Sequence, residues 1–105
     1  MRLENKIAIV TGAAQGIGRG IAIEFAKEGA DLMLMDLNGD RLAQTAKEIE
    51  ALGRKVETCV GNVADEETVV ACVNKTVEVF GRIDIMMHAA GILFSGSIID
   101  LDIKN

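Results

Sequence analysis

The sequence has no proline, tryptophan or tyrosine, and its only aromatic residues are Phe25, Phe80 and Phe94. Without proline there is no proline-rich linker, and the 105 residues suit one small domain. So few aromatic residues, together with a formal charge of −5, leave no basic surface with interleaved aromatic side chains. A nucleic-acid partner is therefore disfavoured.

Cysteine and long apolar runs are also scarce. Cys59 and Cys72 have neither zinc-ligand spacing nor a CxxC pattern, so we interpret both as small buried hydrophobic residues in a reducing cytosol, and we predict no metal site. No uncharged apolar run approaches the ~18 residues of a membrane span. The N-terminal apolar stretch, which follows Arg2, Glu4 and Lys6, leads into glycines rather than a cleavage site. We therefore expect a cytoplasmic protein.

Four short apolar runs predict β-strands. They are Lys6–Val10, Asp31–Asp36, Lys55–Gly61 and Asp84–His88. The runs DLMLMD and DIMMH are apolar at consecutive positions, a pattern typical of strands covered on both faces in a parallel sheet.

The segments between these strands carry apolar residues at steps of three or four, which predicts three amphipathic helices. The apolar stripes are Ile17, Ile21 and Phe25; Leu42, Ala46, Ile49 and Leu52; and Val69, Val73, Val77 and Phe80. Asp40 and Asp65 are the predicted N-caps of the second and third helices. Gly29, Gly53 and Gly81 are predicted to end the three helices in the left-handed conformation.

The resulting βαβαβαβ order predicts an α/β fold, a doubly wound parallel sheet of the Rossmann type with strand order 3-2-1-4. Such sheets normally continue with further strands, and "IIDLDIKN" opens what should be another helix. We therefore expect residues 1–105 to be the N-terminal part of a single NAD(P)-binding domain in a longer protein. The fourth strand is left as an apolar edge, and we expect a homo-oligomer to form through that edge or through the surfaces that later helices would cover.

The stretch "TGAAQGIGRG", residues 11–20, joins the first strand to the first helix. Gly12 is predicted to allow a tight turn, Gly16 to let backbone N–H groups approach a pyrophosphate, and Gly18 to let the helix pack closely on the strand. The spacing is GxxxGxG rather than GxGxxG, and the absence of GK(S/T) excludes a P-loop. The alternative is a glycine-rich turn that binds no ligand.

Asp36 ends the second strand, eighteen residues after Gly18. A carboxylate there is placed to accept hydrogen bonds from both hydroxyls of an adenosine ribose and to repel a 2′-phosphate. Gln15 and Leu37 supply no cation, and Arg41 belongs to the next helix, so NAD is preferred over NADP. The alternative is a solvated carboxylate at a strand end.

These motifs resemble a known family. "TGAAQGIG" is similar to the TGxxxGxG signature of the short-chain dehydrogenase/reductase family, while "GNVADEETV" and "GRIDIMMHAAGI" resemble its loop after the third strand and its fourth strand with the NNAG motif. The resemblance implies NAD(P)-dependent oxidation of a small-molecule alcohol or reduction of a ketone, with hydride transfer at the nicotinamide. The cofactor-binding residues implied are Gly12, Gln15, Gly16, Ile17, Gly18, Asp36, Asn62, Val63, Ala89, Ala90 and Gly91.

Within that set, the resemblance assigns Asn62 and Val63 to the adenine, and the Ala89–Gly91 segment to the ribose and nicotinamide side. Asn62 stands where the family most often has aspartate, and His88 and Ala89 stand where it has two asparagines. We interpret His88 as a structural hydrogen-bonding residue rather than an acid or base. Ser95 and Ser97 are interpreted as the rim of a substrate pocket.

The family's chemistry needs a tyrosine as general acid/base, a lysine four residues later and a serine that holds the carbonyl. Because this sequence contains no tyrosine, we predict no catalytic residue in it and expect the chain alone to be inactive. It would supply the dinucleotide-binding half of an oxidoreductase. The alternative is a non-catalytic nucleotide-binding or assembly module.

Overall fold

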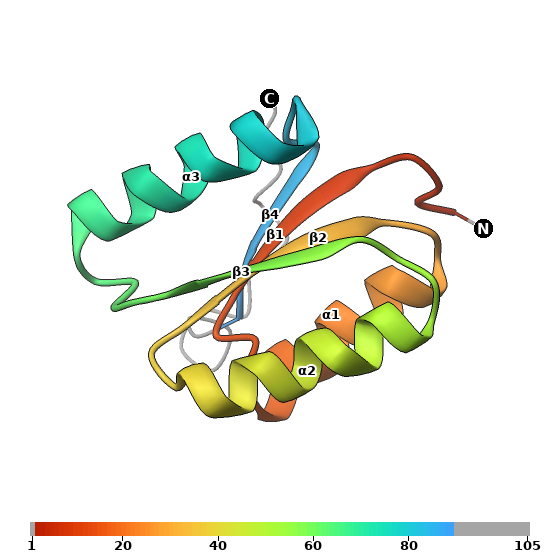
Figure 1. The fold of residues 1–105 in the computed structure, drawn as a ribbon, viewed down its shortest axis with the longest axis horizontal. Helices are drawn as coiled ribbons and strands as arrows, with labels where there is room; N and C mark the ends of the chain where they lie inside the picture. Colours follow the sequence, from red (N-terminus) through yellow and green to blue (C-terminus); the bar gives the residue numbers. More distant parts are fainter. Residues whose placement is uncertain (1, 90–105) are drawn as a thin grey trace.

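A computed structural model describes residues 2–89 and shows four parallel strands joined by three helices (Figure 1). The elements are β1 (Ile7–Thr11), α1 (Gly16–Lys27), β2 (Asp31–Asp36), α2 (Gly39–Ala51), β3 (Val56–Val60), α3 (Glu66–Phe80) and β4 (Ile85–His88). The strand order is β3-β2-β1-β4, with α1 and α2 on one face of the sheet and α3 on the other. The predicted fold class and strand order are confirmed.

The strands lie where the apolar runs predict them, with small differences at their ends. β2 has the predicted bounds, whereas β1 begins at Ile7 and extends to Thr11. β3 and β4 are shorter than predicted, at Val56–Val60 and Ile85–His88. The four central residues of β2 are fully buried, as expected of an inner strand, while β4 is partly exposed because it is the outer strand of the described sheet.

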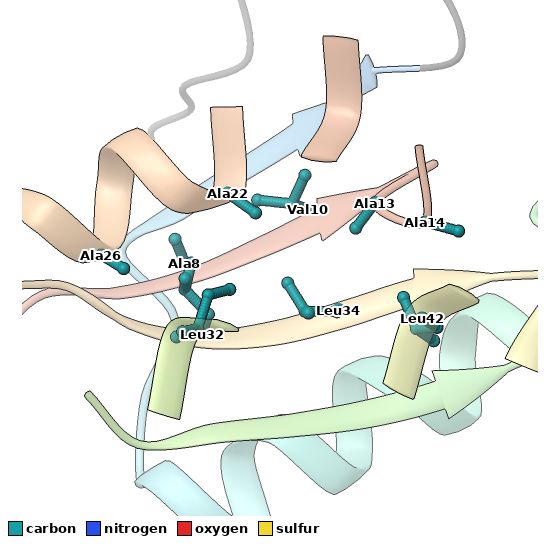
Figure 2. Packing of buried hydrophobic residues seen from close by; sticks show 10 residues of the cluster. Ala8, Val10, Ala13, Ala14, Ala22, Ala26, Leu32, Leu34 and Leu42 are labelled. Carbon is teal, nitrogen blue, oxygen red and sulfur yellow. The ribbon is translucent and has the colours of Figure 1, made fainter. Parts of the chain in front are cut away.

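Helix α1 bears out the predicted stripe only in part: Ile21 and Phe25 are partly buried and pack against the core, but the fully buried face lies beside them. The buried residues are Gly18, Ala22 and Ala26, whereas Ile17 is 47% exposed. Figure 2 shows Ala22 beside Val10 and Ala26 near Ala8, with small side chains along the contact. Small residues allow a helix to approach the sheet closely, so the larger Ile and Phe side chains of the predicted stripe lie on its flanks.

Helices α2 and α3 turn most of the predicted apolar stripes toward the core, but each also buries a threonine that the stripes did not include. Leu52 and Val77 are exposed, while Thr45 and Thr76 are fully buried. The hydroxyl of Thr76 donates to the carbonyl of Cys72 at 2.7 Å, and that of Thr45 donates to a carbonyl four residues earlier. A hydroxyl satisfied within its own helix can be buried at little cost, which an apolar pattern does not reveal.

The helix ends confirm most of the predicted caps. Asp65 caps α3, and its side chain accepts a hydrogen bond from the backbone N–H of Glu67. The prediction for α2 was wrong, because the N-cap is Asn38 and Asp40 lies in the first turn. Asn38 directly precedes the helix, and its side-chain oxygen accepts a hydrogen bond from the N–H of Arg41 in the first turn. The three predicted helix-ending glycines all have positive φ, between 87° and 98°.

The cysteines lie on facing elements, Cys59 on β3 and Cys72 on α3. Cys72 is buried and Cys59 is partly buried, with its sulfur 3.8 Å from the sulfur of Met33. Burial raises the pKa of the Cys72 thiol to about 12, with a further contribution from the neighbouring Cys59. Cys72 therefore stays protonated at neutral pH and behaves as a small apolar side chain, in line with the sequence interpretation.

Asp84 fixes the start of β4 against β1. Its carboxylate accepts hydrogen bonds from the backbone N–H of Ile7 at 2.8 Å and from the Arg82 side chain at 2.9 Å. Burial opposes ionisation, but these hydrogen bonds and the charges of Arg82 and Lys6 outweigh it, so the pKa of Asp84 is lowered. This anchor sets the register that brings the far end of β4 beside the glycine loop.

Candidate functional site

The glycine loop turns sharply where β1 ends. Gly12 has φ of 70° and donates its N–H to the carbonyl of Met35 at 2.8 Å, so the loop is held against the end of β2. Gly16 has φ of 59°, and a Cβ placed on it would meet nothing within 4 Å. Its backbone therefore faces open space, as a backbone that binds a ligand requires.

Gly18 packs against the loop that precedes its own helix. A Cβ on Gly18 would lie 1.7 Å from the carbonyl oxygen of Gly12 and 3.1 Å from the Cβ of Ala89. Only glycine allows this approach, which agrees with the close packing predicted for Gly18. The same contact brings Ala89, just after β4, to the loop.

The N-terminus of α1 has no side-chain cap. Gln15 is its N-cap residue but makes no capping hydrogen bond, and the first turn contains no acidic residue. In α2 and α3, by contrast, Asn38 and Asp65 accept hydrogen bonds from backbone N–H groups. The first N–H groups of α1, and the positive end of its dipole, are therefore left for an anion.

Two hollows adjoin at this end of the sheet and share Gly12 and Asp36. The larger, about 420 Å³, is lined by Gly12, Gln15, Gly16, Ile17, Gly18, Asp36 and Ala89. The smaller, about 170 Å³, is lined by Gly12, Asp36, Leu37, Gly61, Asn62 and Val63. The structure thus brings together every predicted cofactor-binding residue that it describes. Ala90, Gly91, Ser95 and Ser97 lie outside the described residues.

Asp36 lies where the two hollows meet and lines both of them. One carboxylate oxygen accepts the N–H of Ala14 in the glycine loop, and the other accepts the N–H of Asn38, both at 3.0 Å. These bonds fix the orientation of the carboxylate. Each oxygen keeps a further lone pair that can accept a hydrogen bond from a ligand hydroxyl.

Asn62 shapes the loop after β3. Its side-chain oxygen accepts the N–H of Ala64 at 2.8 Å, and its backbone carbonyl accepts the N–H of Asp65. Next to it, Gly61 donates its N–H to the carbonyl of Asp36 at 2.9 Å. An aspartate oxygen would make the same side-chain turn, so asparagine at this position preserves the wall of the smaller hollow.

Arg41 contacts the glycine loop, although its place on the following helix did not predict this contact. It lies in the first turn of α2, and its guanidinium donates a hydrogen bond to the side-chain oxygen of Gln15. The only available signal was its position just after a strand that ends at the same edge of the sheet. Leu37 and Gly61 were also missed as lining residues, although each adjoins a predicted region.

His88 links the ends of β4 and β1. Its Nδ1 lies 3.4 Å from the hydroxyl oxygen of Thr11, which is fully buried. The Thr11 hydroxyl lies at the same distance from the carbonyl of Met87. These contacts support the interpretation of His88 as a structural residue.

A third hollow, about 480 Å³, lies near the amino end of β3 and includes Arg54, Lys55 and Phe80 in its wall. It is larger than either hollow beside the glycine loop, but it is at the opposite end of the sheet, and Arg54 is already bonded to the carbonyls of Gly29 and Gly53. Parallel sheets bind ligands at the carboxyl ends of their strands, so the candidate site is the one at Asp36. Within residues 2–89 there is no group of metal-ligating side chains and no helix long and apolar enough to cross a membrane.

Comparison with known proteins gives similar sequences and folds. The family model for short chain dehydrogenases matches residues 6–105. The 3-oxoacyl-[acyl-carrier-protein] reductase of Thermotoga maritima is 42% identical over 92 residues, which are 88% of this chain and 37% of that protein.

Two solved structures are also similar. Carveol dehydrogenase from Mycobacterium avium has 34% identity and a TM-score of 0.78, and the match covers 81% of this chain and 35% of that one. L-Sorbose reductase from Gluconobacter frateurii has 38% identity and a TM-score of 0.77, over 82% of this chain and 34% of that one. The chain therefore spans a little over a third of the length of such relatives.

Proposed function

Because the chain belongs to the short-chain dehydrogenase family, we propose that it forms the dinucleotide-binding part of an oxidoreductase that transfers hydride between NAD and an alcohol or ketone. One observation carries the proposal: the uncapped N-terminus of α1 and the Asp36 carboxylate face the same hollow. The first suits a pyrophosphate and the second a ribose. The similar proteins are dehydrogenases or reductases, and no observation favours the non-catalytic alternative.

The residues of the site fit the cofactor part by part. In this proposal the N–H groups at Gly16–Gly18 hold the pyrophosphate, and Asp36 accepts the hydroxyls of the adenosine ribose. Asn62 and Val63 contact the adenine in the smaller hollow, and the segment from Ala89 to Gly91 lies toward the nicotinamide. When bound, the nicotinamide ring accepts or donates the hydride.

Hydride transfer to or from an alcohol or ketone also requires proton transfer, and none of the cofactor-binding residues is assigned that role. The sequence has no tyrosine, the acid/base residue that the family resemblance implies. We propose that residues 1–105 belong to a longer cytoplasmic protein whose further residues supply proton transfer and recognise the substrate. The task of this chain is then to bind and orient the dinucleotide.

The choice of NAD rests on Asp36 and on the ribose 2′-hydroxyl. Among the similar structures, the carveol dehydrogenase was solved in complex with NAD and the L-sorbose reductase with NADPH and L-sorbose. Both dinucleotides therefore occur in this group. A carboxylate favours the cofactor with two free ribose hydroxyls, because it accepts their hydrogens and repels a phosphate at the same place.

Calorimetric titration with NAD and with 2′-deoxy-NAD tests this proposal. The wild-type chain should bind NAD about 10- to 100-fold more tightly than 2′-deoxy-NAD. This difference is the one expected for a hydrogen bond between the 2′-hydroxyl and the charged Asp36 carboxylate. The Asp36→Ala variant should lose most of that difference, whereas Glu50→Ala, at the far end of α2, should keep it. Absence of NAD binding to the folded wild-type chain, or equal affinity for the two dinucleotides, would count against the proposal.

A further inference from the structure

The two cysteines face each other across the contact between β3 and α3. Lys75 of α3 lies 3.8 Å from the Glu57 carboxylate of β3 and donates to the carbonyl of Thr58 at 2.9 Å, which holds the two elements together. Cys59 follows Glu57 by two residues, so both side chains leave β3 on the same face. Cys72 precedes Lys75 by three residues and therefore lies on the same side of α3.

The direction of α3 brings these two positions to the same level. A helix that connects parallel strands runs opposite to them, so a step back along α3 from Lys75 corresponds to a step forward along β3 from Glu57. The two sulfurs share one part of the core. Cys72 belongs to the buried cluster that includes Met33, and Cys59 packs against that cluster with its sulfur 3.8 Å from the sulfur of Met33.

The two thiols differ in their access to solvent. Cys59 is partly exposed, whereas Cys72 is only 1% exposed. An oxidant from solution therefore meets Cys59 first, and Cys72 can react only with a group that is already attached to Cys59. Because this second step occurs within one chain, the proximity of the two sulfurs offsets the raised pKa of the Cys72 thiol.

We propose that Cys59 and Cys72 form a reversible disulfide when the chain meets a small-molecule disulfide such as oxidised glutathione. The Cys59 thiolate attacks one sulfur of the reagent, displaces one glutathione and remains joined to the other. The Cys72 thiol then loses its proton, and its sulfur attacks the sulfur of Cys59 and displaces the second glutathione. Two protein thiols are oxidised to one disulfide, and their protons and electrons pass to two glutathione thiols.

This disulfide fastens the loop at the carboxyl end of β3. Residues 60–71 lie between the cysteines and include Asn62 and Val63, which line the smaller hollow. A cross-link reduces the conformations open to the enclosed segment in the unfolded chain. Oxidation therefore stabilises the fold and ties both ends of the segment that forms this wall. Under the proposed function the wall contacts the adenine, but formation of the disulfide does not depend on that function.

Mass spectrometry of the full chain after incubation with oxidised glutathione tests the proposal. Trypsin cleaves after Lys55 and Lys75, so one peptide, residues 56–75, carries both cysteines. In the wild type this peptide should lack two hydrogens and carry no glutathione, and dithiothreitol should restore its mass. Cys72→Ala should stop with glutathione attached to Cys59. Cys59→Ala should stay unmodified while the chain is folded, because only the buried thiol remains.

Thermal unfolding followed by circular dichroism measures the consequence for the fold. The Tm of the oxidised wild type should exceed that of the reduced wild type by about 10 °C, as expected for a cross-link that closes a loop of this size. Neither single variant should show this rise after the same treatment.

Four results would overturn the inference. They are an absence of reaction at Cys59; a wild type that stops with glutathione attached, as Cys72→Ala should; disulfides that join two chains instead of residues 59 and 72 of one chain; and an internal disulfide that fails to raise the Tm. All of these measurements are made without dinucleotide, so they leave the proposed function to its own test.

Discussion

At Gly18, the absence of a methyl group decides how closely α1 approaches the sheet. The helix is in contact there with the carbonyl of Gly12 and with Ala89, so it joins two sides of the candidate site. The neighbouring Gly20 lies in the same helix, but a Cβ on it would meet nothing within 4 Å. The two glycines therefore have different roles.

Alanine substitution should separate these roles. Gly18→Ala should lower the free energy of unfolding by about 1–3 kcal/mol, because the new methyl group forces the loop away from the helix. Gly20→Ala should raise it by about 0.5–1 kcal/mol, because alanine is the better helix former and the site is open. Urea denaturation of both variants measures the difference. A Gly18→Ala protein as stable as wild type would show that the loop adapts freely.

At the scale of the element, the N-cap residue Asn38 determines where α2 begins. Asn38 accepts the N–H of Arg41, while Asp40 makes no capping bond although its acidic side chain follows the usual pattern for a helix start. The cap also fixes the turn from which Arg41 extends to Gln15. The contact between Arg41 and the glycine loop thus depends on how α2 begins.

Replacing the cap should cost more than replacing the acid beside it. We expect Asn38→Ala to lower the free energy of unfolding by about 1 kcal/mol, because one N–H group at the start of α2 loses its partner. Asp40→Ala should change it by less than about 0.5 kcal/mol through the helix dipole alone. Thermal unfolding followed by circular dichroism provides the measurement. Equal losses would indicate that Asp40 contributes to the cap.

Local signals in the sequence predicted the elements but not every contact between them. The helix-ending glycines and the run of β2 were predictable because backbone conformation and consecutive apolar residues mark them directly. The buried face of α1 was not, because close packing selected alanine over the larger Ile and Phe side chains. The contact between Gln15 and Arg41 joins residues 26 positions apart, and only the folded chain brings them together.

At the scale of the whole molecule, the two outer strands of the described sheet differ. At the β3 edge, Lys75 of α3 donates to the carbonyl of Thr58 at 2.9 Å and lies 3.8 Å from the Glu57 carboxylate. This edge therefore carries charge, and part of its backbone is already hydrogen-bonded. β4 reads IMMH and carries neither lysine nor a carboxylate. An apolar outer strand favours pairing with another chain.

We therefore predict that residues 1–105, prepared alone, self-associate through β4. Sedimentation velocity should show an average mass that rises with concentration above the 11.2 kDa of the monomer. Val60→Lys, on the β3 edge where Val60 is 61% exposed, should leave the association unchanged. A monomer at every concentration would disprove the prediction, and a loss of association in Val60→Lys would assign it to the other edge.

The two backbone hydrogen bonds of Asp36 limit how coenzyme preference can change during evolution or engineering. The carboxylate that would distinguish the coenzymes also ties Ala14 of the glycine loop to the turn at Asn38. Under the proposed function, exchanging it for a smaller or basic residue would change selectivity and would also remove these two hydrogen bonds. A residue that replaces Asp36 would therefore have to restore the hydrogen bonds to Ala14 and Asn38 if the glycine loop is to stay anchored to the end of β2.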